Sequence, residues 1–182
     1  MIVRRERNDD VGRVRAVQAA AFDRHDGAEA GEAALLDALR LDPAWIPALS
    51  IVAELPGPAP AVSGVVGHVV CTRGRVLDAD EQEVTNAVGL GPIAVDPAVQ
   101  HDGIGSALVH AALGAADALG YGFVALLGSP GYYGRFGFVR STEVGIDPPE
   151  PAWGAHFQVR TLSAFDPAAR GRFVYAAPFD AA

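Results

Sequence analysis

The stretch Gln100-His101-Asp102-Gly103-Ile104-Gly105 lies between an apolar segment, Ile93-Ala94-Val95, and a run of helical periodicity at residues 106–119. Two glycines therefore lie in the expected connection between a strand and a helix. Such a position offers free backbone N–H groups and the positive end of the helix dipole to a phosphate. Glycine lacks a Cβ, so an anion can approach the backbone closely. The stretch predicts either a phosphate-binding turn or a tight strand-to-helix turn that binds nothing.

The residues after this stretch form one apolar stripe of helical period. Its members recur at steps of three and four residues: Ile104, Ala107, Leu108, Ala111, Ala115, Ala118 and Leu119. Gly120 suits the left-handed position just past a helix end. The pattern predicts a helix that starts at Gly103 and ends before Gly120.

Two other phosphate-binding loops are excluded. A P-loop requires a lysine after its second glycine, and this chain contains no lysine. A dinucleotide fingerprint requires a third glycine three residues after Gly-x-Gly. Leu108 stands at that place after Gly103-Ile104-Gly105. Ala94 stands there after Gly89-Leu90-Gly91, where a strand and not a helix follows.

A second cluster follows about twenty-five residues later, and the two together resemble the GNAT superfamily of acetyl-CoA-dependent N-acetyltransferases. The family's pyrophosphate loop, Q/R-x-x-G-x-G/A, is similar to Gln100-His101-Asp102-Gly103-Ile104-Gly105. Its later Tyr-x-x-x-Gly-Phe motif is similar to Tyr133-Gly134-Arg135-Phe136-Gly137-Phe138. The stretch from Gly128 to Phe138 resembles a bacterial subgroup with a GxPxYYGRFGF-type motif. The resemblance is strong over residues 89–140 and rests elsewhere on the order of elements.

This resemblance implies an α/β chain with the GNAT fold: a mixed central sheet, splayed at the cofactor-binding strands and flanked by helices. Residues 1–182 are expected to form a single N-acetyltransferase domain. It implies acetyl-CoA as cosubstrate, with no metal. The cofactor-binding residues implied in this way are Ile93, Ala94, Val95, Gln100, His101, Asp102, Gly103, Ile104, Gly105, Ser106 and Ser129.

Tyr133 occupies the family position of the general acid, which protonates the CoA thiolate as it leaves. Its alternative is a core aromatic with a satisfied hydroxyl, whereas Phe136 and Phe138 are expected in the core. Ser129 either contacts CoA or caps the next helix. Asp102 departs from the basic or small residue that many members carry: it would repel a pyrophosphate or cap the helix, and a protonated His101 would offset part of that effect.

Gly91 and Pro92 fall inside the strand that precedes the loop. Proline cannot donate to a strand ladder and glycine often marks a bulge, so the ladder is expected to be interrupted here. In the GNAT family, freed backbone groups at this place pair with the amides of pantetheine. An ordinary edge strand is the alternative.

The general base is not identified by the sequence. Many family members carry a Glu at the start of this strand, where this chain has Thr85-Asn86-Ala87, with Glu83 slightly upstream. His68 is a second candidate, although a lone strand histidine is more often structural. No covalent route is supported, because His68 and Cys71 are three apart in a strand and point to opposite faces. Direct attack by the acceptor amine within a ternary complex is the expected mechanism.

Composition limits the remaining choices. The chain has 182 residues, of which 50% are hydrophobic, and a formal net charge of −8. Its arginines are dispersed, so we expect no nucleic acid partner. One cysteine excludes an internal disulfide and a Cys-based zinc site. We expect no membrane span or signal peptide, and a cytoplasmic location.

Alternating strands and helices predict a mixed α/β sheet. We expect strands at residues 2–5, 49–55, 62–73, 88–95, 123–127, 157–162 and 173–175, with a connection from Gly74. Asp9 or Asp10 is expected to cap a first helix that ends at Ala21. A second helix at residues 30–41 is expected to turn one face inward, namely Ala34, Leu35, Ala38, Leu39 and Leu41.

Three functions remain open on these residues. The first is an N-acetyltransferase acting on a small-molecule or peptide amine, for which the resemblance implies a homodimer as a common state. The others are a non-catalytic acyl-CoA-binding sensor or regulatory module, and an interaction protein whose glycines serve packing. The acidic segment at residues 23–29, which borders the acceptor cleft in GNAT folds, favours a cationic acceptor over an anionic one.

Overall fold

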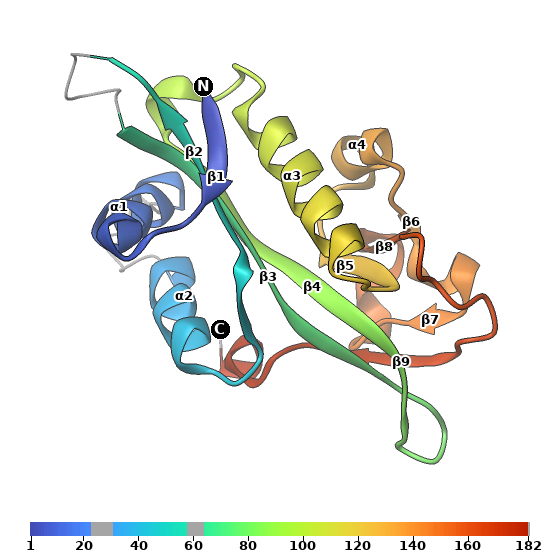
Figure 1. Ribbon diagram of the computed structural model, residues 1–182. Helices are drawn as coiled ribbons and strands as arrows, with labels where there is room; N and C mark the ends of the chain where they lie inside the picture. The colour runs from blue at the N-terminus through green and yellow to red at the C-terminus, as the bar shows by residue number, and fades with distance from the viewer. Residues whose placement is uncertain (23–30, 58–63, 182) are drawn as a thin grey trace.

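One mixed sheet organises the computed structural model, which describes residues 1–22, 31–57 and 64–181 (Figure 1). The strands within these ranges are β1 (Ile2–Arg5), β2 (Trp45–Leu55), β3 (Gly64–Leu77), β4 (Glu83–Val95), β5 (Phe123–Leu127), β6 (Val139–Arg140), β7 (Ile146–Asp147), β8 (Phe157–Thr161) and β9 (Gly171–Val174). The helices are α1 (Val11–Ala21), α2 (Gly31–Leu41), α3 (Ile104–Ala118) and α4 (Pro130–Tyr133).

The strand order is β1-β2-β3-β4-β5-β8-β6, and β9 adds to β3 and pairs with β7. The pairs β4–β5 and β7–β9 are parallel, and the other pairs in the described ranges are antiparallel. The helix α3 forms the crossover between the parallel strands β4 and β5, as a parallel connection requires. Mixed pairing flanked by helices confirms the expected α/β fold.

Helices cover both faces of the sheet, with α1 and α2 on one side and α3 and α4 on the other (Figure 1). Two neighbouring residues of β3 show how the faces divide. A Cβ on Gly67 would lie 3.0 Å from Leu108 of α3, whereas His68 bonds to Gln18 of α1. Successive strand residues point to opposite faces, so α1 and α3 are separated by the sheet.

The largest core cluster lies between α3 and the sheet. It includes fully buried side chains of the sheet and of α3, among them Val66, Val69, Val88, Leu108 and Ala112. Phe136 and Phe138 belong to the same cluster, with exposed fractions of 7% and 4%, as expected from the sequence. Burial of these apolar surfaces ties the helix after the glycine loop to the strand before it.

The strand β4 parts from β5 halfway along its length. Pairing with β5 ends at Gly89, opposite Ala125, although β4 continues to Val95. On its other edge, β4 shifts register against β3 between Leu90 and Ile93, and the Gly91–Pro92 peptide bond there is cis. The predicted interruption is confirmed as a bulge. Beyond it, no described strand pairs with the outer edge of β4.

Three expected strand boundaries were wrong by four residues or more. The strand β4 begins at Glu83 and not at residue 88, because its first residues pair with β3. The strand β3 does not end before Gly74 but runs to Leu77, because both β4 and β9 pair with this extension. A Cβ on Gly74 would lie 2.2 Å from the ring of Phe173, so the glycine makes room for an aromatic side chain of β9. The strand β2 begins four residues early, at Trp45, and accommodates Pro47 where its register with β3 is irregular.

Two expectations about the first helices also need correction. The buried residues of α2 are Ala33, Leu36 and Leu39, whereas Leu41 is 89% exposed. Asp10 does not cap α1 with its side chain. Its carboxylate instead accepts hydrogen bonds from Arg4 Nη1 at 2.6 Å and from the backbone N–H of Arg7 at 2.7 Å. The charged partner explains the difference, because Arg4 outcompetes a neutral helix N–H for the carboxylate.

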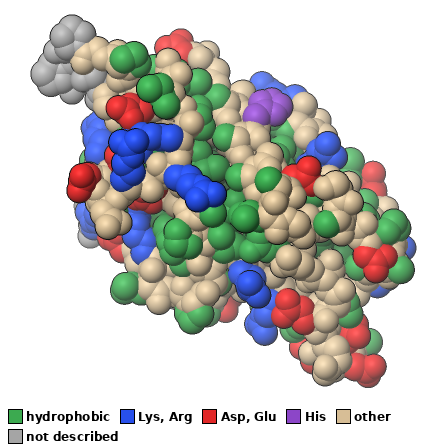
Figure 2. All heavy atoms as spheres, in the orientation of Figure 1, with side chains coloured by type: hydrophobic (Ala, Val, Ile, Leu, Met, Phe, Trp, Pro, Cys, Tyr) green, Lys and Arg blue, Asp and Glu red, His purple; other side chains and the backbone are tan. Residues whose placement is uncertain are grey.

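Acidic and basic side chains are interspersed on the face of the molecule shown in Figure 2, with hydrophobic side chains between them. Within the described ranges, no helix combines the length and the apolar character needed to span a lipid bilayer. The acidic segment at residues 23–29 lies outside the described residues.

Candidate functional site

The loop between β4 and α3 is held in place by its own polar side chains. Asp96 accepts a hydrogen bond from the Ala98 N–H at 3.1 Å. Its carboxylate also forms an ion pair with Arg13, whose Nη2 lies 2.7 Å away. Gln100 Nε2 donates to the carbonyl of Val95 at 3.0 Å. The loop is therefore closed onto the end of β4 and anchored to α1.

Gly103 is the N-cap of α3, and its φ of 80° lies in the left-handed region. The backbone N–H of Ala107 donates to the carbonyl of Gly103 at 3.0 Å, which is the first bond of the helix. The N–H groups of the first turn have no carbonyl one turn earlier to accept them. They open toward the space beside the loop, where a Cβ on Gly103 would meet no heavy atom within 4 Å.

A cavity of about 520 Å³ lies at this helix N-terminus. Its lining residues are Val95, Gln100, His101, Gly103, Ile104, Gly105, Ser106, Tyr132 and Arg135. The structure thus brings seven of the residues predicted to bind the cofactor around one hollow. Asp102 is exposed and is not among the lining residues, and no side chain caps α3 at Gly103. The predicted competition of Asp102 for the helix N–H groups is therefore wrong.

Tyr132 and Arg135 also line this loop cavity, and neither was predicted from the sequence to bind the cofactor. The Arg135 guanidinium lies 4.5 Å from the centre of the Tyr132 ring, and its Nε donates to the Tyr132 carbonyl at 2.9 Å. A cation over an aromatic face is favourable. Arg135 adds a positively charged side chain to the cavity that holds the helix N-terminus. In the sequence it stands inside the aromatic motif, where nothing marks it as a ligand-binding residue.

A second cavity, of about 530 Å³, lies where β4 and β5 separate. Its lining includes Leu90, Gly91, Pro92 and Ile93 from the bulge, together with Leu127 from the end of β5 and Tyr133. Ile93 lines this cavity and Val95 lines the loop cavity. The unpaired segment of β4 therefore connects the two hollows.

Tyr133 sits at the second cavity with its ring partly buried. A Cβ on Gly128 would lie 2.3 Å from the Tyr133 ring, so the ring rests directly on the backbone after β5. Burial raises the pKa of Tyr133 to about 12, with a smaller contribution from Tyr132. The phenol is therefore protonated throughout the neutral range, as a proton donor must be.

The other lining residues of the Tyr133 cavity come from distant parts of the chain. They are Phe22, Glu32, Leu35, Trp153, Tyr175 and Phe179. Burial raises the pKa of Tyr175 well above its usual value. No sequence motif links these six residues, so the sequence analysis assigned none of them to the site.

Ala94 and Ser129, both predicted to bind the cofactor, line neither cavity. Ala94 is buried and lies opposite His68 on β3. Ser129 is the N-cap residue of α4, but its side chain makes no capping hydrogen bond. Its carbonyl accepts the N–H groups of Tyr132 and Tyr133, each at 3.0 Å, so its backbone helps to place both phenols.

The sequence candidates for the base lie away from Tyr133. Thr85, Asn86 and Ala87 are in the paired part of β4, before the bulge, and Glu83 is exposed at its start. His68 is fully buried on the α1 side of the sheet. Its Nδ1 lies 3.0 Å from Gln18 Nε2 and its Nε2 lies 2.9 Å from Ser50 Oγ.

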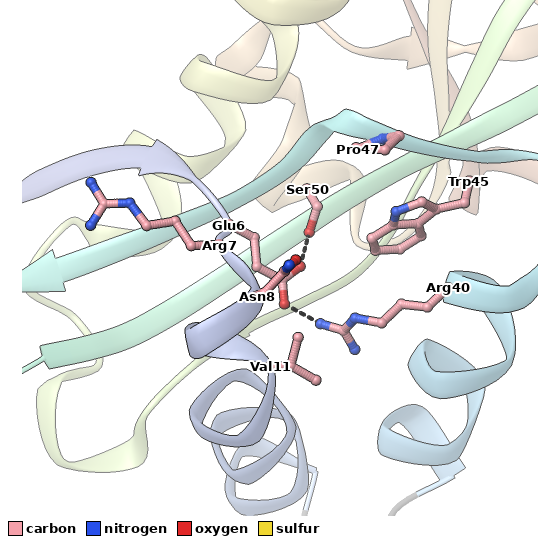
Figure 3. Close-up of a pocket in the computed structure, with 8 residues that line it drawn as sticks. All are labelled: Glu6, Arg7, Asn8, Val11, Arg40, Trp45, Pro47 and Ser50. Carbon is pink, nitrogen blue, oxygen red and sulfur yellow. Dashed lines mark hydrogen bonds and ion pairs between the residues drawn. The ribbon is translucent and has the colours of Figure 1, made fainter.

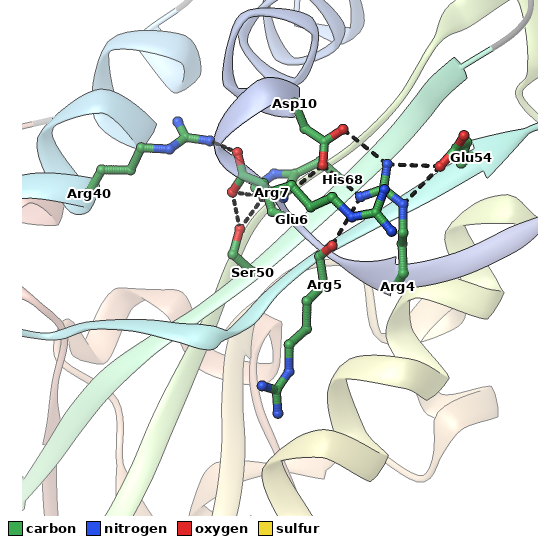
Figure 4. Close-up of polar contacts among 9 residues, drawn as sticks. All are labelled: Arg4, Arg5, Glu6, Arg7, Asp10, Arg40, Ser50, Glu54 and His68. Atoms are coloured by element: carbon green, nitrogen blue, oxygen red, sulfur yellow. Dashed lines mark hydrogen bonds and ion pairs between the residues drawn. The ribbon is translucent and has the colours of Figure 1, made fainter.

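His68 belongs to a buried polar network that joins α1 and α2 to the sheet (Figure 4). Ser50 donates to Glu6, and Glu6 also pairs with Arg40. Burial, with a smaller contribution from Arg40, lowers the pKa of His68 to about 3. His68 is therefore neutral, and both of its ring nitrogens are engaged within the protein.

A smaller cavity, of about 260 Å³, lies beside this network (Figure 3). Glu6, Ser50 and Arg40 point toward one another in its wall, and the Arg40 guanidinium lies 5.5 Å from the centre of the Trp45 ring. Neither Tyr133 nor any residue of the glycine loop lines this cavity. It belongs to the packing of α1 and α2.

The structure also shows the state of the cysteine thiol and of the side chains that could bind a metal ion. Cys71 is buried, and burial raises the pKa of its thiol to about 12. Within the described ranges, no group of three His, Cys, Asp or Glu side chains is placed to hold a metal ion.

The chain is similar in sequence to known acetyltransferases. Residues 24–138 match the model of the acetyltransferase (GNAT) family. Over 99 residues, the chain is 33% identical to the uncharacterized N-acetyltransferase YhbS of Escherichia coli (strain K12). This match covers 54% of the chain and 57% of YhbS, so it spans little more than half of the curated relative.

The structural likeness extends over nearly the whole chain. The crystal structure of YhbS from Escherichia coli in complex with CoA has a TM-score of 0.82, with 26% identity over 98% of this chain and 91% of that one. A GNAT family acetyltransferase from Brucella melitensis in complex with acetyl-CoA has a TM-score of 0.75, with 31% identity over 98% of this chain and 97% of that one.

Proposed function

The chain belongs to the acetyltransferase (GNAT) family, and from that premise we propose that it transfers the acetyl group of acetyl-CoA to an amine. The acceptor is a small-molecule or peptide amine, and it attacks directly within a ternary complex. One observation carries the proposal. The unpaired segment of β4 joins the cavity at the glycine loop to the cavity that contains Tyr133.

The residues of the loop cavity fit the diphosphate of CoA. The first-turn N–H groups of α3 and the positive end of its dipole favour an anion. Gly103 leaves the approach open, and Arg135 adds a positive charge to the same cavity. The solved structures of CoA and acetyl-CoA complexes with this fold support the choice of cosubstrate.

The outer edge of β4 fits an extended ligand. Its backbone groups beyond Gly89 have no partner on β5, so those that point away from β3 can pair with amide groups in the manner of an added strand. In this proposal the far end of the ligand lies at the bulge, in the cavity that Tyr133 lines.

When bound, acetyl-CoA supplies a thioester, which is an acyl group activated toward attack by an amine. The chain positions the reactants and provides a proton. Tyr133 donates its phenolic proton to sulfur as the C–S bond breaks and the acceptor nitrogen bonds to the acetyl carbon. The amine loses one proton in the same reaction, and Tyr133 regains its proton through water.

The proposal is tested by isothermal calorimetry with acetyl-CoA and by thiol release with a panel of amines. The product is identified from the mass added to the amine. We expect acetyl-CoA to bind and thiol to appear only when an amine acceptor is present. Binding without thiol release for any amine class would favour the acyl-CoA sensor, and the absence of binding would reject both functions.

A further inference from the structure

The cavity beside Tyr133 has a lining that indicates the class of acceptor, and this inference rests on the acetyl transfer proposed above. Five aromatic side chains contribute to the wall, namely Phe22, Tyr133, Trp153, Tyr175 and Phe179. The other described lining residues are apolar or glycine, apart from Glu32. The described part of the cavity wall therefore combines apolar side chains with one carboxylate.

The aromatic wall is continuous. The ring centres of Tyr175 and Phe179 lie 4.8 Å apart, and those of Trp153 and Tyr175 lie 6.3 Å apart. Phe179 belongs to the C-terminal turn that returns to α2, near the C-terminus in Figure 1. A flat apolar ring placed against such a wall gains both burial and ring–ring contact.

Among the lining residues that the structure describes, Glu32 is the single charged side chain. It lies in the first turn of α2 and makes no hydrogen bond or ion pair with any residue of the described ranges. Other carboxylates around α2 are paired: Asp37 with Arg15 and Glu6 with Arg40. The cavity thus carries a negative charge for which the described chain supplies no cation.

We propose that the acceptor is a small primary amine with an apolar ring, whose cationic nitrogen is drawn to Glu32 while the ring packs against the aromatic wall. The charge of Glu32 attracts an ammonium ion and repels a carboxylate. Aromatic faces add cation–π attraction for the same ammonium group. Glu32 is accordingly a specificity-determining residue, whereas Tyr133 acts on the leaving group.

The test compares three amines that differ by one feature each. The compound 2-phenylethylamine has both ring and amine, L-phenylalanine adds a carboxylate, and n-butylamine lacks the ring. We expect kcat/KM for 2-phenylethylamine to exceed the values for L-phenylalanine and n-butylamine by about tenfold or more.

The variant Glu32→Gln keeps the size of the side chain and removes its charge. We expect it to raise KM for 2-phenylethylamine by about tenfold, with kcat changed less than about threefold. Calorimetry with 2-phenylethylamine on the CoA-saturated protein should show the same loss of affinity without turnover. Glu143→Gln is the matched control, because Glu143 is exposed and lines neither cavity.

Each outcome decides the inference. Equal KM in the parent and Glu32→Gln, or a preference for L-phenylalanine or n-butylamine, overturns it and leaves acetyl transfer standing. A fall in thermal stability with unchanged KM returns Glu32 to a role at the helix N-terminus, where a carboxylate is favourable. Failure of acetyl-CoA to bind, or of any amine to release thiol, rejects the proposed function itself.

Discussion

The phenolic proton of Tyr133 is the single group on which the proposed turnover depends most. Tyr133→Phe removes only the hydroxyl and keeps the ring against Gly128 and Phe138. We expect kcat to fall by about a hundredfold, which is typical for loss of a general acid, with little change in acetyl-CoA affinity. Thiol-release kinetics and calorimetry measure the two quantities. Equal turnover in parent and variant would show that Tyr133 is a core aromatic residue and not the proton donor.

The pH profile gives a separate test of the same residue. Because burial raises the pKa of Tyr133 to about 12, its phenol stays protonated at pH values well above 7. The acceptor amine must lose a proton before it attacks, so turnover should rise with pH and then level off. We expect no decline below about pH 10 that depends on Tyr133. A decline in that range that disappears in Tyr133→Phe would show that the pKa of Tyr133 is not raised, although Tyr133 would remain the proton donor.

Gly103 allows a test in which backbone strain is matched. Gly103 and Gly120 lie at opposite ends of α3 with φ of 80° and 79°, and a Cβ on either meets no heavy atom within 4 Å. Alanine at each position should therefore cost similar stability, about 1 to 2 kcal/mol. We expect only Gly103→Ala to weaken acetyl-CoA binding, by about tenfold or more, because its methyl group faces the anion. Equal affinities in the two variants would disprove the loop assignment.

At the scale of elements, sequence patterns predicted a helix correctly where neighbouring residues determine its ends and its buried face. The α3 stripe and the glycines at its two ends predicted the helix within one residue at each end. The same approach failed for α2, because that helix is apolar on more than one side and periodicity alone does not select a face. The packed face is set by Leu36, which belongs to the cluster with Val52 and Val70 on distant strands.

The buried network under α1 predicts a dependence of stability on acid. The pKa of His68 is lowered to about 3 in the folded protein and is about 6.5 in the unfolded chain. Below pH 6.5 the unfolded state therefore binds a proton that the folded state does not. Stability falls as pH falls through this window, by about 1.4 kcal/mol per pH unit.

This linkage is measured by urea unfolding at pH 7 and pH 5. His68 should contribute about 2 kcal/mol to the loss of unfolding free energy between these values. His68→Gln should remove that contribution, whatever its stability at pH 7. Carboxylates such as Asp10 contribute to the pH dependence of stability in both the parent and His68→Gln. The difference between the two proteins in the loss of unfolding free energy therefore gives the contribution of His68. Parallel losses in parent and variant would show that His68 is not neutral in the fold.

At the scale of the whole molecule, the site is assembled from segments that no single motif contains. The glycine loop was predictable because its residues are consecutive and their chemistry is local. The wall of the second cavity was not, because Phe22, Glu32, Trp153 and Phe179 meet only after the sheet has formed and the C-terminal turn has returned to α2. Their types alone predict a core aromatic or a solvated carboxylate at each position.

The separation of β4 from β5 predicts that cosubstrate binding stabilises the fold as a unit. The two parts of the sheet share a short ladder that ends at Gly89 and Ala125, and a ligand along the free edge of β4 would extend their contact. At one hundred times its dissociation constant, acetyl-CoA should add about 2.7 kcal/mol of stability. For a chain of this length, that shifts the melting temperature by about 5 to 10 °C.

Hydrogen exchange locates the effect. We expect acetyl-CoA to slow exchange of the β4 amides between Leu90 and Val95 that point away from β3, and of the first turn of α3, because these N–H groups gain acceptors from the ligand. Pro92 has no N–H and reports nothing. The β1–β2 edge, which lies across the sheet from the separation, should change only as global stability does. At the same acetyl-CoA concentration, a tenfold loss of affinity in Gly103→Ala should reduce the added stability to about 1.4 kcal/mol, roughly halving the thermal shift, and should weaken the local protection. Protection confined to β1 and β2, or a thermal shift unaffected by Gly103→Ala, would place the ligand elsewhere on the molecule.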